Sequence, residues 1–241
     1  MNQLQPPSLT HVFCKYDLGL DIFSRFIIAA RPSVMVSVVS VTLALVAGVS
    51  IGLASGFFGG WVDITGMRMM DVVFSFPVML LALAIVAMLG PGIVPAMLAI
   101  AVVYTPFFAR ITRASVLTVR EETYIKAARS IGASNARILR LHVLPNIMAA
   151  IIVQTSLSLA FAILTEAALS FLGLGVQPPT PSWGRMLFDG RGFLPDAWWM
   201  AVFPGAAIFL TVLALNLVGD AMRDALDPRQ RSAIESRRGN L

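Results

Sequence analysis

The residues that could support chemistry in this chain are few, and a serine within "GVSIG" at 48–52 is the first to consider. This stretch matches the G-x-S-x-G pattern, in which a serine on a sharp strand-to-helix turn acts as a nucleophile. Ser50, however, lies within residues 32–62, a run without any charge. Neither His11 nor His142 falls within the centre of such a run to serve as its base. We therefore expect no catalytic residue, and an intramembrane serine hydrolase is the disfavoured alternative.

Nucleotide and metal chemistry are also not expected. The phosphate-binding loop of ATPases requires Gly-Lys followed by Ser or Thr, whereas the two lysines, Lys15 and Lys126, follow Cys14 and Ile125. One cysteine and two distant histidines predict no metal site. Any ATP must be hydrolysed by a partner, and no cofactor is expected.

The glycines around Ser50 have a simpler explanation. Gly48, Gly52, Gly56 and Gly60 recur every four residues and share one face of a helix. Small residues at this spacing let a second helix approach the backbone closely in a membrane. We expect helix packing here, against a helix of this chain or of a second subunit.

The composition points to a membrane protein. The chain is 57% hydrophobic and 13% charged, against about 45–50% and about 25% in soluble domains. Residues 32–62, 72–109, 141–165 and 197–219 carry no charge, and about 20 apolar residues suffice to span a bilayer. The net charge of +5 lies between these runs, so no nucleic-acid partner is expected.

The number and bounds of the membrane spans follow from these uncharged runs. "GPGIVP" at 90–95 divides the longest run, because glycine and proline interrupt helices. The sequence therefore predicts an all-α, polytopic membrane protein with about five spans, at 34–56, 70–89, 94–112, 147–168 and 199–219.

The basic residues predict the orientation. Thirteen of the 18 lysines and arginines lie in 57–71, 110–145 and the region after 219, which the positive-inside rule makes cytoplasmic. We expect an extracytoplasmic segment 1–31, a permease domain 32–220 and a cytoplasmic tail 221–241. Residues 17–30 are expected to form a helix along the membrane surface or a loosely ordered tail. Segment 173–198 is expected to form an external cap.

Apart from Asp71 at the edge of span 70–89, Glu166 is the only acidic residue within a predicted span. Intramembrane acids are candidates for functional roles. It lies 21 residues after Pro145, about 31 Å along a helix, which places it near the outer interface. The alternatives are a residue of an outer gate and a hydrated helix end.

The cytoplasmic loop 120–145 has its own helical pattern. Tyr124, Ala127, Ala128 and Ile131 form a helical stripe, Gly132 follows as a C-cap, and Ser134 can cap a second short helix. We expect Pro145 to disfavour helical geometry at Leu144 and to mark the start of the next span. The positive-inside rule explains the charges of the loop, but the stripe requires a surface to pack against.

This pattern resembles a known family. Ala127-Ala128, Gly132 and Leu144-Pro145 are similar to the "EAA" loop of permeases of bacterial ABC importers. "LTEAALSFLGLGVQPPTPSWGRML" (164–187) and "DLGLDIFSRFIIAAR" (17–31) resemble the dipeptide, oligopeptide and nickel permeases. The likeness extends over residues 11–227. Lys126 and His142 depart from the glutamate and isoleucine usual in the family, whose first span would precede residue 11.

The resemblance implies a function and partners. The loop would dock on an ATPase, with Ala127, Ala128 and Gly132 at the contact. The chain would form half of a path for peptides, or for nickel or another small solute, across the bacterial inner membrane. Its partners would be a paralogous permease, two cytoplasmic ATPases, a periplasmic solute-binding protein and membrane lipid. A self-sufficient secondary transporter is disfavoured, since no span carries a midplane acid or charge pair.

Overall fold

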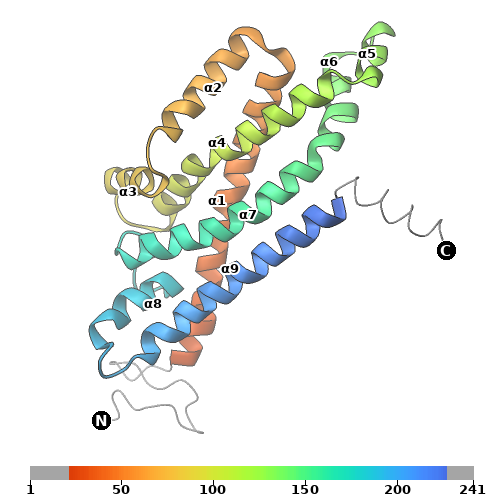
Figure 1. Ribbon diagram of the computed structural model, residues 1–241. Helices are drawn as coiled ribbons and strands as arrows, with labels where there is room; N and C mark the ends of the chain where they lie inside the picture. The colour runs from red at the N-terminus through yellow and green to blue at the C-terminus, as the bar shows by residue number, and fades with distance from the viewer. Residues whose placement is uncertain (1–21, 227–241) are drawn as a thin grey trace, which may run out of the picture. The chain divides into compact units, whose positions relative to one another are not determined.

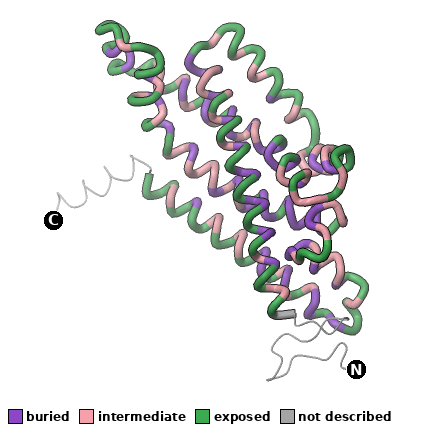
Figure 2. The backbone as a smooth tube through the Cα atoms, turned by 180° about the vertical axis from the view of Figure 1, so that it is seen from behind, coloured by how far each residue is buried: buried purple, intermediate pink, exposed green. Residues whose placement is uncertain are grey.

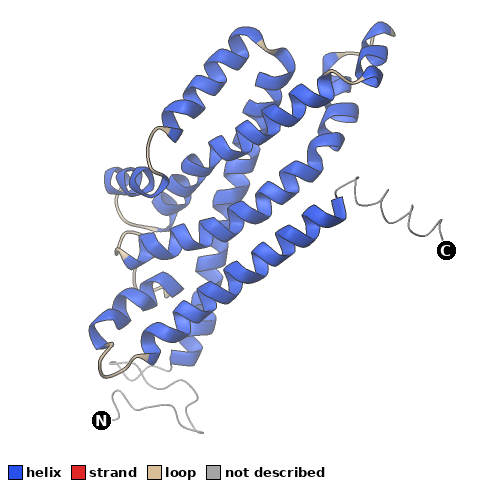
Figure 3. Ribbon diagram, in the orientation of Figure 1, coloured by secondary structure: helices blue, strands red, loops and turns tan. Residues whose placement is uncertain are grey.

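The computed structural model describes residues 22–226, and every regular element in this range is a helix (Figure 3). Residues 1–21 of the expected N-terminal segment and 227–241 of the expected tail lie outside the described residues. The elements, of which α1 to α9 are labelled in Figure 1, are α1 (Ile22–Phe58), α2 (Gly60–Phe74), α3 (Val78–Leu89), α4 (Ile93–Arg120), α5 (Thr123–Ser130), α6 (Asn135–Ile138), η1 (Leu139–Val143), α7 (Leu144–Phe171), α8 (Trp183–Gly190), η2 (Arg191–Phe193) and α9 (Trp199–Leu226).

Four helical stretches are long and apolar enough to cross a membrane: Ser24–Phe58, Ile93–Arg120, Asn135–Phe171 and Trp199–Leu226. The bent pair of α2 and α3 provides a fifth candidate. The prediction of an all-α chain with about five spans is confirmed.

The predicted span 70–89 is not one continuous helix, because α2 stops at Phe74 and α3 begins at Val78, with a bend of 89° between them. Pro77 restricts Phe76 to extended geometry and has no N–H for the helix ladder. Ser75 ends α2 and its Oγ donates to the carbonyl of Val72 at 2.7 Å. The residues expected to form loop 57–71 are instead mostly helical, within α2.

Helix α1 is continuous across the expected boundary at residue 31, with Pro32 inside it. Residues 22–30 therefore do not form a separate surface helix. A proline in a helix removes one backbone hydrogen bond, and a long apolar helix tolerates this loss.

The chain divides into two compact units, each composed of three segments. One unit combines the segments up to Leu43, Phe76–Val103 and Leu159–Leu213. The other, here called the coupling unit, combines Ala44–Ser75, Tyr104–Ser158 and the segment from Ala214. Buried positions recur along the helices of both units (Figure 2). In the coupling unit the core consists of Phe57, Val116, Ile125, Ala128, Ile138, Val143, Ile147 and Ile151.

Candidate functional site

The loop between α4 and α7 contains two short helices, α5 and α6, joined by a glycine turn. Gly132 has a φ of +80°, a region in which only glycine is unstrained. Its N–H bonds to the carbonyl of Arg129 at 2.9 Å, and the N–H of Ala133 bonds to that of Ala128 at 3.1 Å. These two bonds form a Schellman motif. The expected glycine C-cap is therefore present, and it sets the direction of the chain into α6.

The second helix begins as its sequence predicts but does not end before α7. Ser134 is the N-cap of α6, and its Oγ accepts the N–H of Arg137 at 3.4 Å. The π-turn η1 then joins α6 to α7, and Leu144 has helical angles, φ −56° and ψ −47°. The expectation that Pro145 interrupts the helix at Leu144 is wrong. The wider i→i+5 turn accommodates the proline, and Asn146 Nδ2 donates to the carbonyl of His142 at 2.6 Å.

The two faces of α5 have different environments. Ile125 is fully buried and Ala128 is 8% exposed, both within the core of the coupling unit. The side chain of Ala128 therefore packs in this core and does not lie on the exposed face of α5. Ala127 is exposed, as are Tyr124 and Ile131, the latter at 86%.

Tyr124, Ala127 and Ile131 are three and four residues apart, so they share one exposed face at α5. We call Tyr124, Ala127, Ile131 and Leu141 the coupling surface; Leu141 is 59% exposed. Burial and the Glu122 carboxylate raise the pKa of the Tyr124 phenol, so the ring stays neutral. Exposed apolar patches rimmed by charge are typical of protein–protein contacts.

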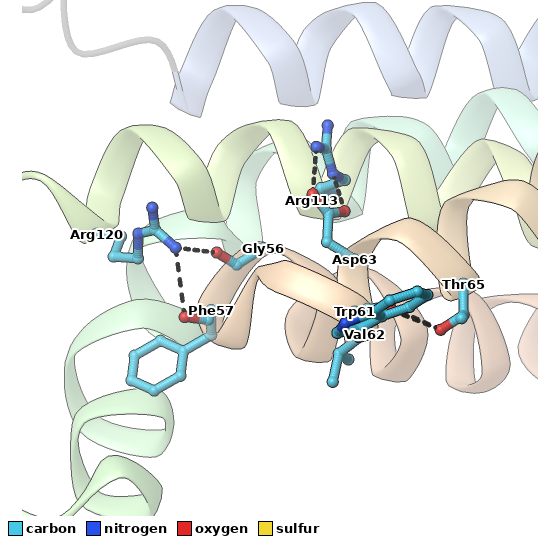
Figure 4. Close-up of polar contacts among 8 residues, drawn as sticks. All are labelled: Gly56, Phe57, Trp61, Val62, Asp63, Thr65, Arg113 and Arg120. Carbon is cyan, nitrogen blue, oxygen red and sulfur yellow. Dashed lines mark hydrogen bonds and ion pairs between the residues drawn. The ribbon is translucent and has the colours of Figure 1, made fainter.

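Arginines fasten the base of this loop to the end of α1. Arg120 donates to the carbonyls of Gly56 at 3.1 Å and Phe57 at 3.4 Å (Figure 4). These carbonyls belong to the last turn of α1, which lacks intrahelical partners. The guanidinium of Arg129 lies 5.4 Å from the ring centre of Phe57. Lys126 pairs with Glu121 at 3.4 Å.

Three of the four glycines in the predicted ladder pack against α4. A Cβ added to Gly48 would lie 2.5 Å from the carbonyl oxygen of Thr105, and one on Gly52 equally close to that of Ala109. On Gly56 it would lie 2.8 Å from the Cβ of Val116. The neighbouring helix therefore belongs to the same chain.

Gly60 does not belong to this contact. It begins α2 with a φ of +55°, and nothing lies within 4 Å of an added Cβ. With Gly59, at φ +67°, it forms the turn from α1 to α2. Ser50 is exposed, and its Oγ donates to the carbonyl of Val46 at 2.7 Å, which is ordinary behaviour for a serine within a helix.

Helices α2 and α4 are joined by two ion pairs that the sequence analysis missed. Arg113 donates to both carboxylate oxygens of Asp63, at 2.5 and 2.6 Å (Figure 4). Arg110 donates to Asp71 at 2.7 Å, and its guanidinium lies 4.2 Å from the ring centre of Phe74. The sequence offered one signal for these pairs, the eight-residue separation of Asp63 and Asp71. That spacing indicates a shared set of partners only if the segment between them is helical.

Glu166 occupies a buried polar cluster in the other unit. Its Oε1 accepts the hydroxyl of Ser170 at 2.8 Å, and the hydroxyls of Ser33 and Ser182 face the same carboxyl group. Glu166 and all three serines are fully buried. Glu166 therefore does not lie at a hydrated helix end, which was one of the two alternatives.

Each of these serines also accepts a backbone N–H. The donors are Val176 to Ser170 at 3.0 Å, Trp183 to Ser33 at 3.2 Å, and Arg185 to Ser182 at 3.2 Å. Each hydroxyl therefore still has its proton to donate; that of Ser170 bonds to Oε1 of Glu166, whereas Oε2 is buried without a hydrogen-bond partner. The cluster thus places side chains of α1, α7 and the start of α8 around one buried acidic group.

The described residues contain no group of three or more His, Cys, Asp or Glu side chains arranged to hold a metal. The residues found together are therefore of three kinds: a coupling surface, a pair of salt bridges between helices, and a buried carboxylate bonded to serines.

Comparison with known proteins gives this arrangement a family context. The family model "Binding-protein-dependent transport system inner membrane component" matches residues 48–232. The "Dipeptide transport system permease protein DppC" of Alkalihalophilus pseudofirmus is 48% identical over 231 residues, which cover 96% of this chain and 76% of that protein.

Other relatives are similar in extent. The "Di/tripeptide transport system permease protein DppC" of Pseudomonas aeruginosa is 48% identical, covering 90% of this chain and 72% of that one. The "Glutathione transport system permease protein GsiD" of Pectobacterium atrosepticum is 45% identical, covering 94% and 75%. A solved chain of the inward-facing MetNI methionine ABC transporter has a TM-score of 0.70 at 17% identity, covering 86% of this chain and 98% of that one. At this identity it shows a shared fold.

Proposed function

The chain belongs to the family of binding-protein-dependent transport system inner membrane components, and we propose that it forms half of the path by which an ATP-driven importer moves short peptides across a bacterial inner membrane. The substrate class rests on the relatives, whose names specify dipeptides, di- and tripeptides, and glutathione. All three are short peptides or peptide-like molecules.

The coupling surface is the observation that carries the role of this subunit. A cytoplasmic ATPase changes conformation on binding and hydrolysing ATP, and a permease must receive that motion through a contact. Tyr124, Ala127, Ile131 and Leu141 present an exposed apolar face, while Ile125 and Ala128 bury the opposite face in the core that contains the ends of α1 and α4. Force applied to α5 therefore reaches the transmembrane helices without an intervening flexible segment.

The proposed assembly contains a paralogous permease, two cytoplasmic ATPases and a periplasmic solute-binding protein, in the lipid bilayer. Glu166 would act at the outer gate as a positioning residue, because it fastens the segment that leads into α8 to the helices beside it. The hydrolase alternative has no support, since Ser50 is an exposed helix residue bonded to its own backbone.

Two measurements test this proposal. Uptake of a labelled dipeptide should require this chain together with its partner subunits, and unlabelled di- and tripeptides should compete with it. Competition by nickel salts but not by peptides would contradict the substrate class.

The orientation is tested by cysteine labelling in intact cells after Cys14→Ser. Ala136→Cys, on α6, should be protected from an impermeant reagent, whereas Gly192→Cys should react. Both positions are exposed in the structure, so burial does not confuse the comparison. Equal reactivity at the two positions would reject the proposed orientation.

A further inference from the structure

A charged pocket of about 490 Å³ lies along α2 and α4 in the coupling unit. Three guanidinium groups line it, those of Arg68, Arg110 and Arg113, together with the carboxylates of Asp63 and Asp71. The two carboxylates are already paired, with Arg113 and Arg110 respectively. The pocket therefore carries an excess of one positive charge.

Arg68 supplies that excess charge. It is exposed, and among the described residues no carboxylate pairs with it. An unpaired arginine in a membrane helix is costly unless it reaches water, an anion or a headgroup. The two salt bridges beside it join α2 to α4 and hold the guanidinium groups of Arg110 and Arg113 in place at the pocket.

The pocket lies toward the C-terminal end of α4, a helix long enough to cross a bilayer. Helix α4 has 28 residues and is about 42 Å long, close to the 40–45 Å thickness of a bilayer with its headgroups. Arg113 and Arg110 precede the C-terminal end of α4 by seven and ten residues, about 10 and 15 Å, and long arginine side chains near a helix end extend toward the membrane interface. At the start of α2, Trp61 is 80% exposed, and tryptophan is enriched at the membrane interface.

Apolar side chains continue from the charged part of the pocket. Ile64 and Met67 form its apolar wall, and Ile64 is 55% exposed. Further along α2, Met69 and Val72 are 68% and 63% exposed. A ligand whose anionic group lies among the arginines could therefore pack an apolar chain against these side chains of α2.

We propose that this pocket binds the phosphate of an anionic phospholipid, with an acyl chain lying along α2. Basic pockets between transmembrane helices favour such headgroups, and guanidinium groups bind phosphate through paired, charge-assisted hydrogen bonds. Arg68 provides the free charge, and Arg110 and Arg113 share their remaining donors with the phosphate. This lipid site goes beyond the transport function.

The test is lipid retention by the purified full chain, measured by native mass spectrometry. Phosphatidylglycerol and phosphatidylcholine with the same acyl chains are compared at equal concentration. The wild-type chain should retain phosphatidylglycerol in preference, and Arg68→Gln should lower that preference about fivefold, since one arginine near the membrane surface contributes about 1 kcal/mol. Asp71→Asn should raise it, because Arg110 is released from its partner.

Controls separate the site from general basicity and from misfolding. Arg137→Gln removes an exposed cation of α6, outside the pocket, and should leave the preference unchanged. Circular dichroism should show equal helicity in all variants. The opposite effects of Arg68→Gln and Asp71→Asn cannot both arise from loss of structure.

Three results would overturn the proposal. Equal retention of the two lipids by the wild-type chain would show that the pocket does not select a charged headgroup. Displacement of the lipid by free glycerol phosphate at the same concentration would assign the pocket to a small soluble anion. Displacement by a dipeptide would assign it to the translocation path instead.

Discussion

Asp63 and Arg113 join α2 to α4 through two parallel hydrogen bonds of 2.5 and 2.6 Å. Their side chains are 20% and 34% exposed, respectively, so water only partly screens the pair. We expect Asp63→Ala to lower the free energy of unfolding by about 1.5–3 kcal/mol, the usual range for hydrogen bonds to charged groups. Reversible unfolding in mixed detergent micelles measures this change.

A charge exchange provides the control for this pair. The double variant Asp63→Arg with Arg113→Asp should recover part of the stability that either single substitution loses, because the attraction is restored in reverse. Strictly additive losses in the double variant would show that the two side chains do not stabilise each other.

The contact between α1 and α4 is tested at Gly52. A Cβ there would lie 2.5 Å from the carbonyl oxygen of Ala109 and 2.7 Å from the Cβ of Thr112, so Gly52→Leu must separate the helices. We expect this variant to fail in assembly and transport, as measured by its yield in the membrane and by peptide uptake.

Ser50→Ala is the matched control, because it lies two residues away on the exposed side of the same helix. It should leave both quantities nearly unchanged. Loss of uptake or of a hydrolytic activity in Ser50→Ala alone would overturn the packing interpretation.

The helical class and the long spans were predictable, because long uncharged runs have few alternatives to a membrane helix. The break at Pro77 was predictable in principle from proline geometry, yet the apolar run through it obscured the signal. The continuity at Pro145 was not predictable, because it depends on a π-turn that inserts one extra residue, and no composition rule signals that insertion.

The site was predictable only where it depends on local geometry. Gly132 ends α5 because it adopts a positive φ, and Ser134 begins α6 because its side chain caps the helix. Both roles depend on only a few adjacent residues. The Asp63–Arg113 pair joins residues 50 positions apart, and the serines around Glu166 come from α1, α7 and the start of α8. Such pairings depend on tertiary structure, which spacing alone does not specify.

Glu166 should control the segment that leads into α8. Glu166→Ala removes the acceptor for buried serine hydroxyls, and unsatisfied buried polar groups cost about 1–3 kcal/mol each. We expect the loop around Val176, which is 1% exposed, to open. In a Cys14→Ser background, Val176→Cys should resist thiol reagents and become reactive when Glu166→Ala is added.

Glu166→Gln is the conservative comparison, since it keeps the shape and one acceptor oxygen. Its effect on Val176→Cys reactivity should lie between those of the wild type and Glu166→Ala. Unchanged protection in the alanine variant would show that the carboxyl group does not fasten this segment.

Gly132 should be the most sensitive position of the coupling loop. At a φ of +80° a β-branched residue is strongly strained, although no neighbour lies within 4 Å of an added Cβ. Gly132→Val should therefore redirect α6 without creating a clash. We expect the variant to insert normally, while ATP hydrolysis no longer drives peptide uptake.

Cross-linking provides a second measure, and the structure selects the position. Ala128 is buried, so the reporter cysteine belongs at Ala127, which is exposed. Its cross-link to the ATPase should weaken in Gly132→Val and persist in Gly132→Asn, because asparagine tolerates positive φ better than other non-glycine residues. Full uptake with an undiminished cross-link in Gly132→Val would mean that the turn does not transmit the motion of the ATPase. Equal losses in the asparagine and valine variants would instead show that any side chain at 132 obstructs the contact, because the two residues differ mainly in the strain they impose on the backbone.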